Sequence, residues 1–266
     1  MDIIETLVLG LTQGLTEFIP ISSSGHLIIV QTIFSGSSNH LFLEFINIGT
    51  LLALLVYFRK RIFYICKDVF IKRDIVLARN IFLTAIPAGV VGYLLADIIG
   101  SLSFFSSITV VAVTLALVGI VMIFLEKIPK LSPIKGSGAL PASRAFIIGL
   151  AQILSLVPGV SRSGSTIITG RLMGLKPADA AEYSFLASLP IMIGVTAKVF
   201  ISATDRAYFF DNLSVLLLSN TVAFVSGILA VGFIMKYLSS HSLAVFGWYR
   251  VVLSAILTTI LLIQYL

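Results

Sequence analysis

Charged residues are scarce in this sequence. Of its 266 residues, 11% are Asp, Glu, Lys or Arg and 58% are hydrophobic, whereas a soluble globular domain carries about 25% charged residues. The mean hydropathy of +1.08 excludes an ordinary soluble fold and indicates an integral membrane protein. An open sheet would leave unpaired backbone groups in lipid. The chain therefore suits one helical bundle that forms a single membrane domain.

Cysteine and early basic residues are also scarce. Cys66 is the single cysteine, which excludes an intrachain disulfide and a zinc cluster. Asp2 and Glu5 stand near the N-terminus with no early Lys or Arg. Because a signal peptide begins with a positive region, we expect this segment to remain in the mature protein.

Long apolar runs, by contrast, are abundant. A bilayer is crossed by about 20 largely apolar residues. Six stretches meet or nearly meet this length: 41–58, 80–97, 106–125, 183–203, 212–236 and 245–265. Four others are too short or too interrupted: 2–19, 24–35, 143–157 and 163–175. The short stretches form two pairs joined by breaks rich in Pro, Gly and Ser, which predicts two re-entrant helical hairpins.

The two hairpins resemble each other at an offset of 139 residues. The sequence GLTQ at 10–13 aligns with GLAQ at 149–152, and SSSG at 22–25 aligns with SRSG at 161–164. The three spans after each hairpin correspond at about the same offset. Because three is odd, a second copy would be inverted relative to the first.

We therefore predict an all-α polytopic membrane fold with about six transmembrane helices and two re-entrant helical hairpins. Its parts form an inverted-topology repeat of residues 1–126 and 140–266. The loop 59–79 carries seven Lys or Arg against two Asp, so the positive-inside rule places it in the cytoplasm. The same rule accounts for most of the net charge of +6 without nucleic acid as a partner. The first hairpin then enters from outside and the second from the cytoplasm, and their tips meet within the membrane.

The first break, QGLTEFIPISSSGHL at 13–27, gathers polar residues within an apolar chain. Gln13 and Glu17 are spaced i, i+4, so a helix places them on one face. A carboxylate at bilayer depth is usually functional, although pairing with an Arg of another helix is the structural alternative. His26 near Glu17 is a candidate acid, base or nucleophile, or else a core histidine.

The same break also predicts an anion site at a helix start. Pro20 ends one short helix, and Ser22, Ser23 and Ser24 can cap the next. Gly25 lets a ligand approach the backbone closely. The free N–H groups of that helix start attract an anion, and a plain helix cap is the alternative.

The second break, PGVSRSGST at 158–166, repeats this design and adds Arg162. A guanidinium offers five donors in a fork that suits phosphate oxygens. The alternative, an Arg that snorkels to the interface, is disfavoured by its position between a Pro-Gly turn and a helix start. Glu182, Ser184 and Arg250 either line the same cavity or form structural contacts. Together the tips predict a site for a phosphate or diphosphate on a lipid.

The two breaks together resemble the undecaprenyl-diphosphate phosphatase family, also called bacitracin-resistance proteins. Its patterns are Glu/Gln-x-x-x-Glu with a Ser-rich Gly-His turn, and Pro-Gly-x-Ser-Arg-Ser-x-x-Thr, and both occur here in full. Gln13 stands where some relatives have Glu. The matching positions are Gln13, Glu17, Ser23, His26, Ser161, Arg162, Ser163 and Thr166.

The resemblance implies an enzyme that converts undecaprenyl diphosphate to the monophosphate lipid carrier of peptidoglycan synthesis. It also implies a divalent metal, magnesium or calcium, near Glu17 and Gln13, and a place in the bacterial plasma membrane among its lipids with the site open to the outside. The oligomeric state stays open, a homodimer included. The expected catalytic residues are Glu17, Ser23, His26 and Arg162. The expected phosphate-binding residues are Ser22, Ser24, Gly25, Ser161, Ser163, Gly164 and Thr166.

The nucleophile and one alternative function stay open in the sequence. Ser23, His26 or a metal-bound water can attack the phosphorus. The type 2 phosphatidic-acid phosphatases also contain Ser-Gly-His, but their later motif has His where this chain has Ile168. A transporter or flippase of a prenyl phosphate remains, since inverted repeats with broken helices are typical of transporters. Ser23 and His26 beside Arg162 favour an enzyme.

Overall fold

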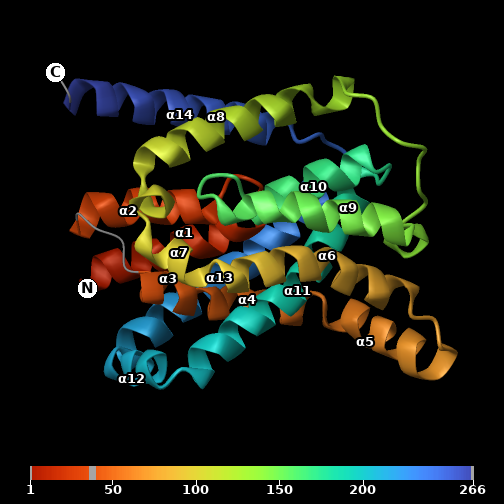
Figure 1. Cartoon of the computed structure of the whole chain (residues 1–266), viewed down its shortest axis with the longest axis horizontal. Helices are drawn as coiled ribbons and strands as arrows, with labels where there is room; N and C mark the ends of the chain where they lie inside the picture. Colours follow the sequence, from red (N-terminus) through yellow and green to blue (C-terminus); the bar gives the residue numbers. More distant parts are fainter. Residues whose placement is uncertain (1, 36–39, 265–266) are drawn as a thin grey trace.

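Helices make up nearly all of the computed structural model, which describes residues 2–35 and 40–264. No strand occurs in those two ranges. Several helices run roughly along one direction, and the long helix Pro177–Ile201 crosses them obliquely (Figure 1). The all-α class predicted from composition is therefore confirmed.

The first part of the chain runs from α1 to α8. Its helices are α1 Ile3–Phe18, α2 Ser23–Ser35, α3 His40–Phe45, α4 Asn47–Tyr57, α5 Arg59–Lys67, a π-helix Asp68–Lys72, α6 Val76–Leu94, α7 Ala96–Ser101, a 3-10 helix Ser103–Ser106 and α8 Ile108–Phe124.

The second part runs from α9 to α14. Short 3-10 helices, Leu125–Lys127 and Ser137–Ala139, precede it. Its helices are α9 Ala142–Ile153, a 3-10 helix Leu154–Leu156, α10 Arg162–Leu172, α11 Pro177–Ile201, α12 Ala203–Asp211, α13 Leu213–Tyr237 and α14 Ala244–Gln264.

The expected number of membrane spans is confirmed. Among the described residues, five helices are long and apolar enough to cross a bilayer: Val76–Leu94, Ile108–Lys127, Pro177–Ile201, Leu213–Tyr237 and Ala244–Ile263. The helix pair Leu41–Tyr57 and Arg59–Lys72 bends by 66° and makes a sixth if the pair is counted as one broken span. Most predicted bounds are right to within about four residues, but the span predicted at 183–203 begins earlier, at Pro177. Residue 265 of the last predicted span lies outside the described ranges. The protein is thus polytopic.

The segment 59–79 is not the loop that we predicted. It stays helical through Lys72, and Arg73, at φ 56°, ends the helical run. The sequence of this segment contains neither Gly nor Pro. The i, i+4 ion pair between Lys72 and Asp68, 2.8 Å apart, also supports a helix. High charge therefore does not mark the end of the helical run in this segment.

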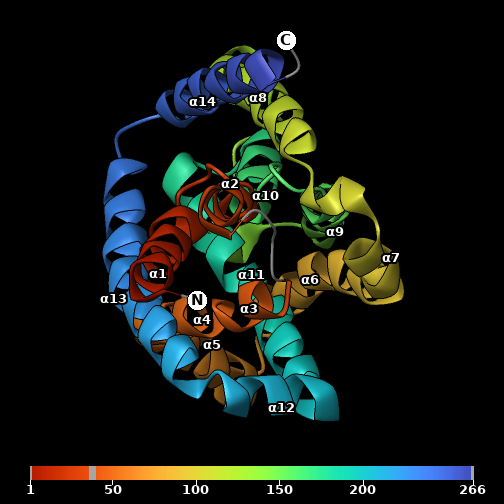
Figure 2. The ribbon, with the colours of Figure 1, turned by 90° about the vertical axis from the view of Figure 1, so that its left-hand side faces the viewer.

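Two short helical pairs, α1–α2 and α9–α10, enter the bundle from opposite ends, and their tips meet near its centre (Figure 1). Viewed along the helices, α2 and α10 lie inside a ring of longer helices (Figure 2). The 13 residues of α2 and the 11 of α10 give lengths of about 20 and 17 Å, short of the roughly 30 Å hydrocarbon core. Their short lengths agree with re-entrant hairpins, whose depth in the membrane stays a prediction.

Each hairpin packs on a helix from the other part of the chain. Helix α1 packs against α13, and α9 packs against α6. A Cβ at Gly10 of α1 would lie 2.6 Å from the carbonyl oxygen of Ser219, and one at Gly149 of α9 would lie 2.8 Å from that of Thr84. Both backbone contacts therefore require glycine. The two packing contacts are thus equivalent at about the predicted offset: each hairpin packs on the corresponding helix of the other part of the chain. The division into two repeats remains a prediction.

Candidate active site

The two hairpin tips contain the same backbone turn. Ser22 and Ser161 both have φ 78°, a left-handed value that is uncommon outside glycine. The hydroxyl of Ser22 accepts a hydrogen bond from the N–H of Gly25 at 3.3 Å, and that of Ser161 accepts one from Gly164 at 3.0 Å. Each turn is a serine cap on the helix that follows. The predicted capping role of this serine run is therefore present in both tips.

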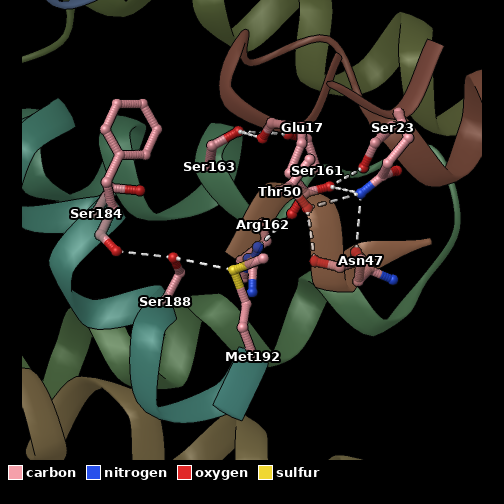
Figure 3. A network of polar contacts seen from close by, with 12 residues as sticks. Glu17, Ser23, Asn47, Thr50, Ser161, Arg162, Ser163, Ser184, Ser188 and Met192 are labelled. Atoms are coloured by element: carbon pink, nitrogen blue, oxygen red, sulfur yellow. Dashed lines mark hydrogen bonds and ion pairs between the residues drawn. The ribbon is translucent and has the colours of Figure 1, made fainter. Parts of the chain in front are cut away.

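An ion pair joins the two tips. Glu17, in the last turn of α1, accepts a hydrogen bond from the guanidinium of Arg162, the first residue of α10 (Figure 3). The Glu17 side chain is 8% exposed and the Arg162 side chain 21% exposed. Glu17 is therefore paired with an Arg of another helix, which is the structural alternative given for it in the sequence analysis. Its further contacts decide what else it can do.

The second carboxylate oxygen of Glu17 receives two more hydrogen bonds. The Ser23 hydroxyl donates to it at 2.5 Å and the Gln13 amide at 3.2 Å. A hydroxyl held by a carboxylate, which is itself held by a third group, is the arrangement of an activated nucleophile. Of the two predicted nucleophilic side chains, Ser23 is the one whose hydroxyl contacts a carboxylate.

Two residues that we did not predict hold Gln13 in place. Its buried amide nitrogen also donates to Asn47 Oδ1 at 2.9 Å and to Thr50 Oγ1 at 3.3 Å (Figure 3). Both residues belong to α4. Their spacing of three within an otherwise apolar span was the signal available in the sequence.

His26 is engaged through both ring nitrogens. Its Nδ1 lies 2.7 Å from the carbonyl oxygen of Ser22, and its Nε2 lies 2.8 Å from the hydroxyl of Tyr249 in α14. The two rings are stacked, with centroids 5.7 Å apart and planes 11° apart. Tyr249 was not predicted as a site residue.

Arg250, the next residue of α14, forms hydrogen bonds with the backbone of both tips. Its fully buried guanidinium donates to the carbonyl oxygens of Pro20 at 3.2 Å, Gly159 at 2.5 Å and Val160 at 3.1 Å. These oxygens belong to both hairpins. Of the three further candidates, Arg250 is therefore the one that touches both tips.

The other two further candidates lie elsewhere. Glu182 pairs with Arg61 at 2.9 Å, so it takes the structural alternative. The Ser184 hydroxyl lies 2.5 Å from that of Thr166, and both side chains are buried. Neither residue reaches the Glu17 carboxylate through these contacts.

Most of the predicted phosphate-binding residues are buried and paired within the protein. The Ser163 hydroxyl, for example, donates to the carbonyl oxygen of Glu17 at 3.4 Å. A Cβ at Gly25 would lie 3.4 Å from Cα of Gly159, so its close backbone approach is to the other tip. Ser24 is exposed, and Ser23, His26 and Arg162 are partly exposed. The buried residues are Ser22, Gly25, Ser161, Ser163, Gly164 and Thr166.

The residues near Glu17 and Gln13, where a metal ion is expected, supply few protein ligands for one. Among the described residues, no group of three or more His, Cys, Asp or Glu is placed to hold a metal. Glu17 offers a carboxylate whose two oxygens both already accept hydrogen bonds. Mg²⁺ is often held by one or two carboxylates together with substrate phosphates. The donor set therefore suits, at most, a metal that arrives with a phosphorylated ligand.

An apolar groove of about 540 Å³ runs along α6, α7 and α11. It extends from Leu156, just before the second tip, to Glu44 and Lys198, whose charged atoms are 3.8 Å apart. A smaller groove of about 340 Å³ shares Phe82 and Pro190 with it. The walls of both grooves can accommodate a hydrocarbon chain.

Fold and site together define a class: a polytopic membrane protein with a charged centre held between two short helical hairpins. The chain belongs to a family, the bacitracin resistance protein BacA family, whose model matches residues 6–256. It is 40% identical over 263 residues to undecaprenyl-diphosphatase 1 of Clostridioides difficile strain 630, covering 96% of this chain and 95% of that protein. Undecaprenyl-diphosphatases of Methanococcus vannielii and Aquifex aeolicus are 37% and 34% identical, covering 92% and 95% of this chain and 95% and 96% of theirs.

Proposed function

We propose that this protein hydrolyses undecaprenyl diphosphate to undecaprenyl phosphate and inorganic phosphate. The family and the names of the relatives support this activity. The observation that carries the mechanism is the contact between Ser23 and a carboxylate that is ion-paired with Arg162. The product would re-enter peptidoglycan synthesis as its lipid carrier, and its supply links this family to bacitracin resistance.

In the first step, the Ser23 hydroxyl attacks the terminal phosphorus in line. Its proton moves to Glu17, the new Ser23 Oγ–P bond forms, and the anhydride P–O bond breaks. Undecaprenyl phosphate leaves with the bridging oxygen. Arg162 and the N-termini of α2 and α10 stabilise the negative charge on the phosphoryl oxygens.

In the second step, water attacks the phosphoserine. The water proton moves to Nε2 of His26 while the Ser23 Oγ–P bond breaks. Ser23 recovers its proton from Glu17, and the proton on His26 leaves with inorganic phosphate. The geometry favours Ser23 over His26 as nucleophile because both nitrogens of His26 are engaged by other groups.

The substrate brings the remaining components. Glu17 and Gln13 would be the residues nearest to a magnesium or calcium ion bound with the diphosphate, and such an ion would neutralise part of the phosphate charge. The prenyl chain lies in the groove along α6 and α11. The basic segment 59–72 faces the cytoplasm, and the site opens to the outer leaflet of the bacterial plasma membrane.

The test is phosphate release from undecaprenyl diphosphate by the purified protein with magnesium. The wild type should release phosphate, and Glu17→Gln and Arg162→Ala should each lose about 10²-fold or more in kcat. Glu17→Gln removes the proton acceptor for Ser23, and Arg162→Ala removes stabilisation of the phosphoryl charge in the transition state. The ion pair between Arg171 and Glu126, 2.8 Å apart, provides the matched control. Arg171→Ala and Glu126→Gln should keep nearly full activity.

Two outcomes would contradict the proposal. Full activity of folded Arg162→Ala would show that the site around Arg162 does not catalyse the reaction. A wild-type protein that binds the lipid yet releases no phosphate with either metal would support the alternative, a transporter or flippase of a prenyl phosphate. Gel filtration of each variant checks that it is folded.

A further inference from the structure

The environment of His26 fixes the position of its proton. A backbone carbonyl oxygen only accepts hydrogen bonds, so the 2.7 Å contact between Nδ1 and the Ser22 carbonyl places a proton on Nδ1. In a neutral imidazole the other nitrogen is then an acceptor. The Tyr249 hydroxyl, 2.8 Å from Nε2, must be the donor of that second hydrogen bond.

The surroundings of Tyr249 argue against a purely structural role. Its side chain is 44% exposed, so it is not a core residue that happens to touch His26. Its neighbour Arg250 is fully buried and binds carbonyl groups of both tips. Arg250 thereby fixes this turn of α14 against the hairpins, and the Tyr249 phenol is presented to His26 from a fixed backbone.

We propose that Tyr249 is a positioning residue for His26. Its phenol O–H donates to Nε2, keeps that nitrogen free of a proton and holds the ring with Nε2 toward the exposed side of the site. In the proposed second step, the attacking water replaces the phenol as the donor to Nε2, and its proton then moves to that nitrogen as the Ser23 Oγ–P bond breaks. This inference rests on the proposed function for the reaction step, but not for the hydrogen bond itself.

The hydrogen bond is tested by NMR of protein labelled with ¹⁵N-histidine. The sequence has three histidines, and the signals of His26 are those absent from His26→Gln. In the wild type, Nδ1 should be protonated and Nε2 should be an unprotonated nitrogen that accepts a hydrogen bond. Tyr249→Phe should shift the Nε2 signal toward that of an unbonded nitrogen. A protonated Nε2 in the neutral wild-type ring, or an unshifted signal in Tyr249→Phe, would overturn the proposal.

The positioning role is tested by kinetics with undecaprenyl diphosphate. Tyr249→Phe should lower kcat by about tenfold, less than the 10²–10⁴ expected for loss of the base itself, and lower KM along with it, so that kcat/KM stays unchanged. Phosphorylated enzyme should accumulate in this variant, because only the second step is slowed. Tyr64→Phe, at a 55% exposed tyrosine in α5, is the control and should behave as the wild type.

The two measurements separate this inference from the proposed function. A wild type without phosphatase activity would overturn the function, while the NMR spectrum would still decide whether Tyr249 sets the state of His26. A shifted Nε2 signal with unchanged kcat would overturn the positioning role, and so would a loss that lies wholly in KM.

Discussion

Ser23 and Ser24 are adjacent, and they differ in what their hydroxyl groups reach. Ser23 donates to Glu17 at 2.5 Å, whereas Ser24 is exposed and its Oγ lies 3.3 Å from that of Ser22. Ser23→Ala should therefore reduce kcat on the order of 10³-fold or more, as expected for loss of a nucleophile. Ser24→Ala removes the same atom one residue away and should cause a much smaller loss. Phosphate release under saturating lipid measures both.

Trapping the intermediate distinguishes Ser23 from His26. Enzyme quenched during turnover should carry acid-stable phosphate, because phosphoserine survives acid whereas phosphohistidine does not. This signal should be absent from Ser23→Ala. Acid-labile phosphate that persists in Ser23→Ala would instead assign the attack to His26.

For individual residues, the sequence predicted which motif residues form the site better than it predicted the residues that they contact. Glu17, Ser23 and Arg162 meet as expected, because two short motifs carried them to the two tips. Tyr249 was missed because it reaches His26 across 223 positions of the chain, and no local pattern encodes that contact. Burial was also missed: Thr166 matches the motif but is 1% exposed, since the inner face of α10 packs on α11.

Among the structural elements, the two serine turns have the same backbone but carry different side chains. At the offset of 139, Ser23 corresponds to Arg162, and Glu17 corresponds to Leu156. The first turn supplies the acid and the hydroxyl, and the second supplies the cation. The two turns therefore make one site rather than two, and neither is complete alone.

The contact between the tips gives a prediction for Gly159. This residue has φ +86°, and a Cβ there would clash with Thr114 Oγ1 and lie 3.0 Å from the carbonyl oxygen of Val111. Gly159→Ala should destabilise the protein by about 2 kcal/mol or more through backbone strain and overpacking. Gly138→Ala, where nothing lies within 4 Å, is the control. Thermal unfolding in detergent measures both, and equal midpoints would contradict the assigned packing.

Spans were easier to predict than the helices between them. Hydropathy reports how apolar a stretch is, so α6 and α8 were found to within about four residues. It does not report helicity, and α5 and the π-helix after it, which contain no buried residue, were taken for a loop.

For the molecule as a whole, orientation is the property to test. Cys66 is exposed, so the experiment starts from Cys66→Ser. In intact cells, Ser103→Cys should react with an impermeant thiol reagent, because the loop between α7 and α8 faces outward in the proposed topology. Phe70→Cys, at an 81% exposed position in the basic segment, should react only after the cells are permeabilised. The reverse pattern would invert the proposed orientation.

The packing of each hairpin on a distant helix bears on how the protein is made. Helix α9 can dock on α6 as soon as the ribosome has produced it, since α6 comes earlier in the chain. Helix α1 must wait for α13, which begins at Leu213. During most of synthesis the Glu17 carboxylate thus lacks its packing surface on α13, and for more than half of it the Arg162 partner as well. Closure of the site becomes a late event in biogenesis, and an unfinished chain has no assembled centre with which to attack lipid.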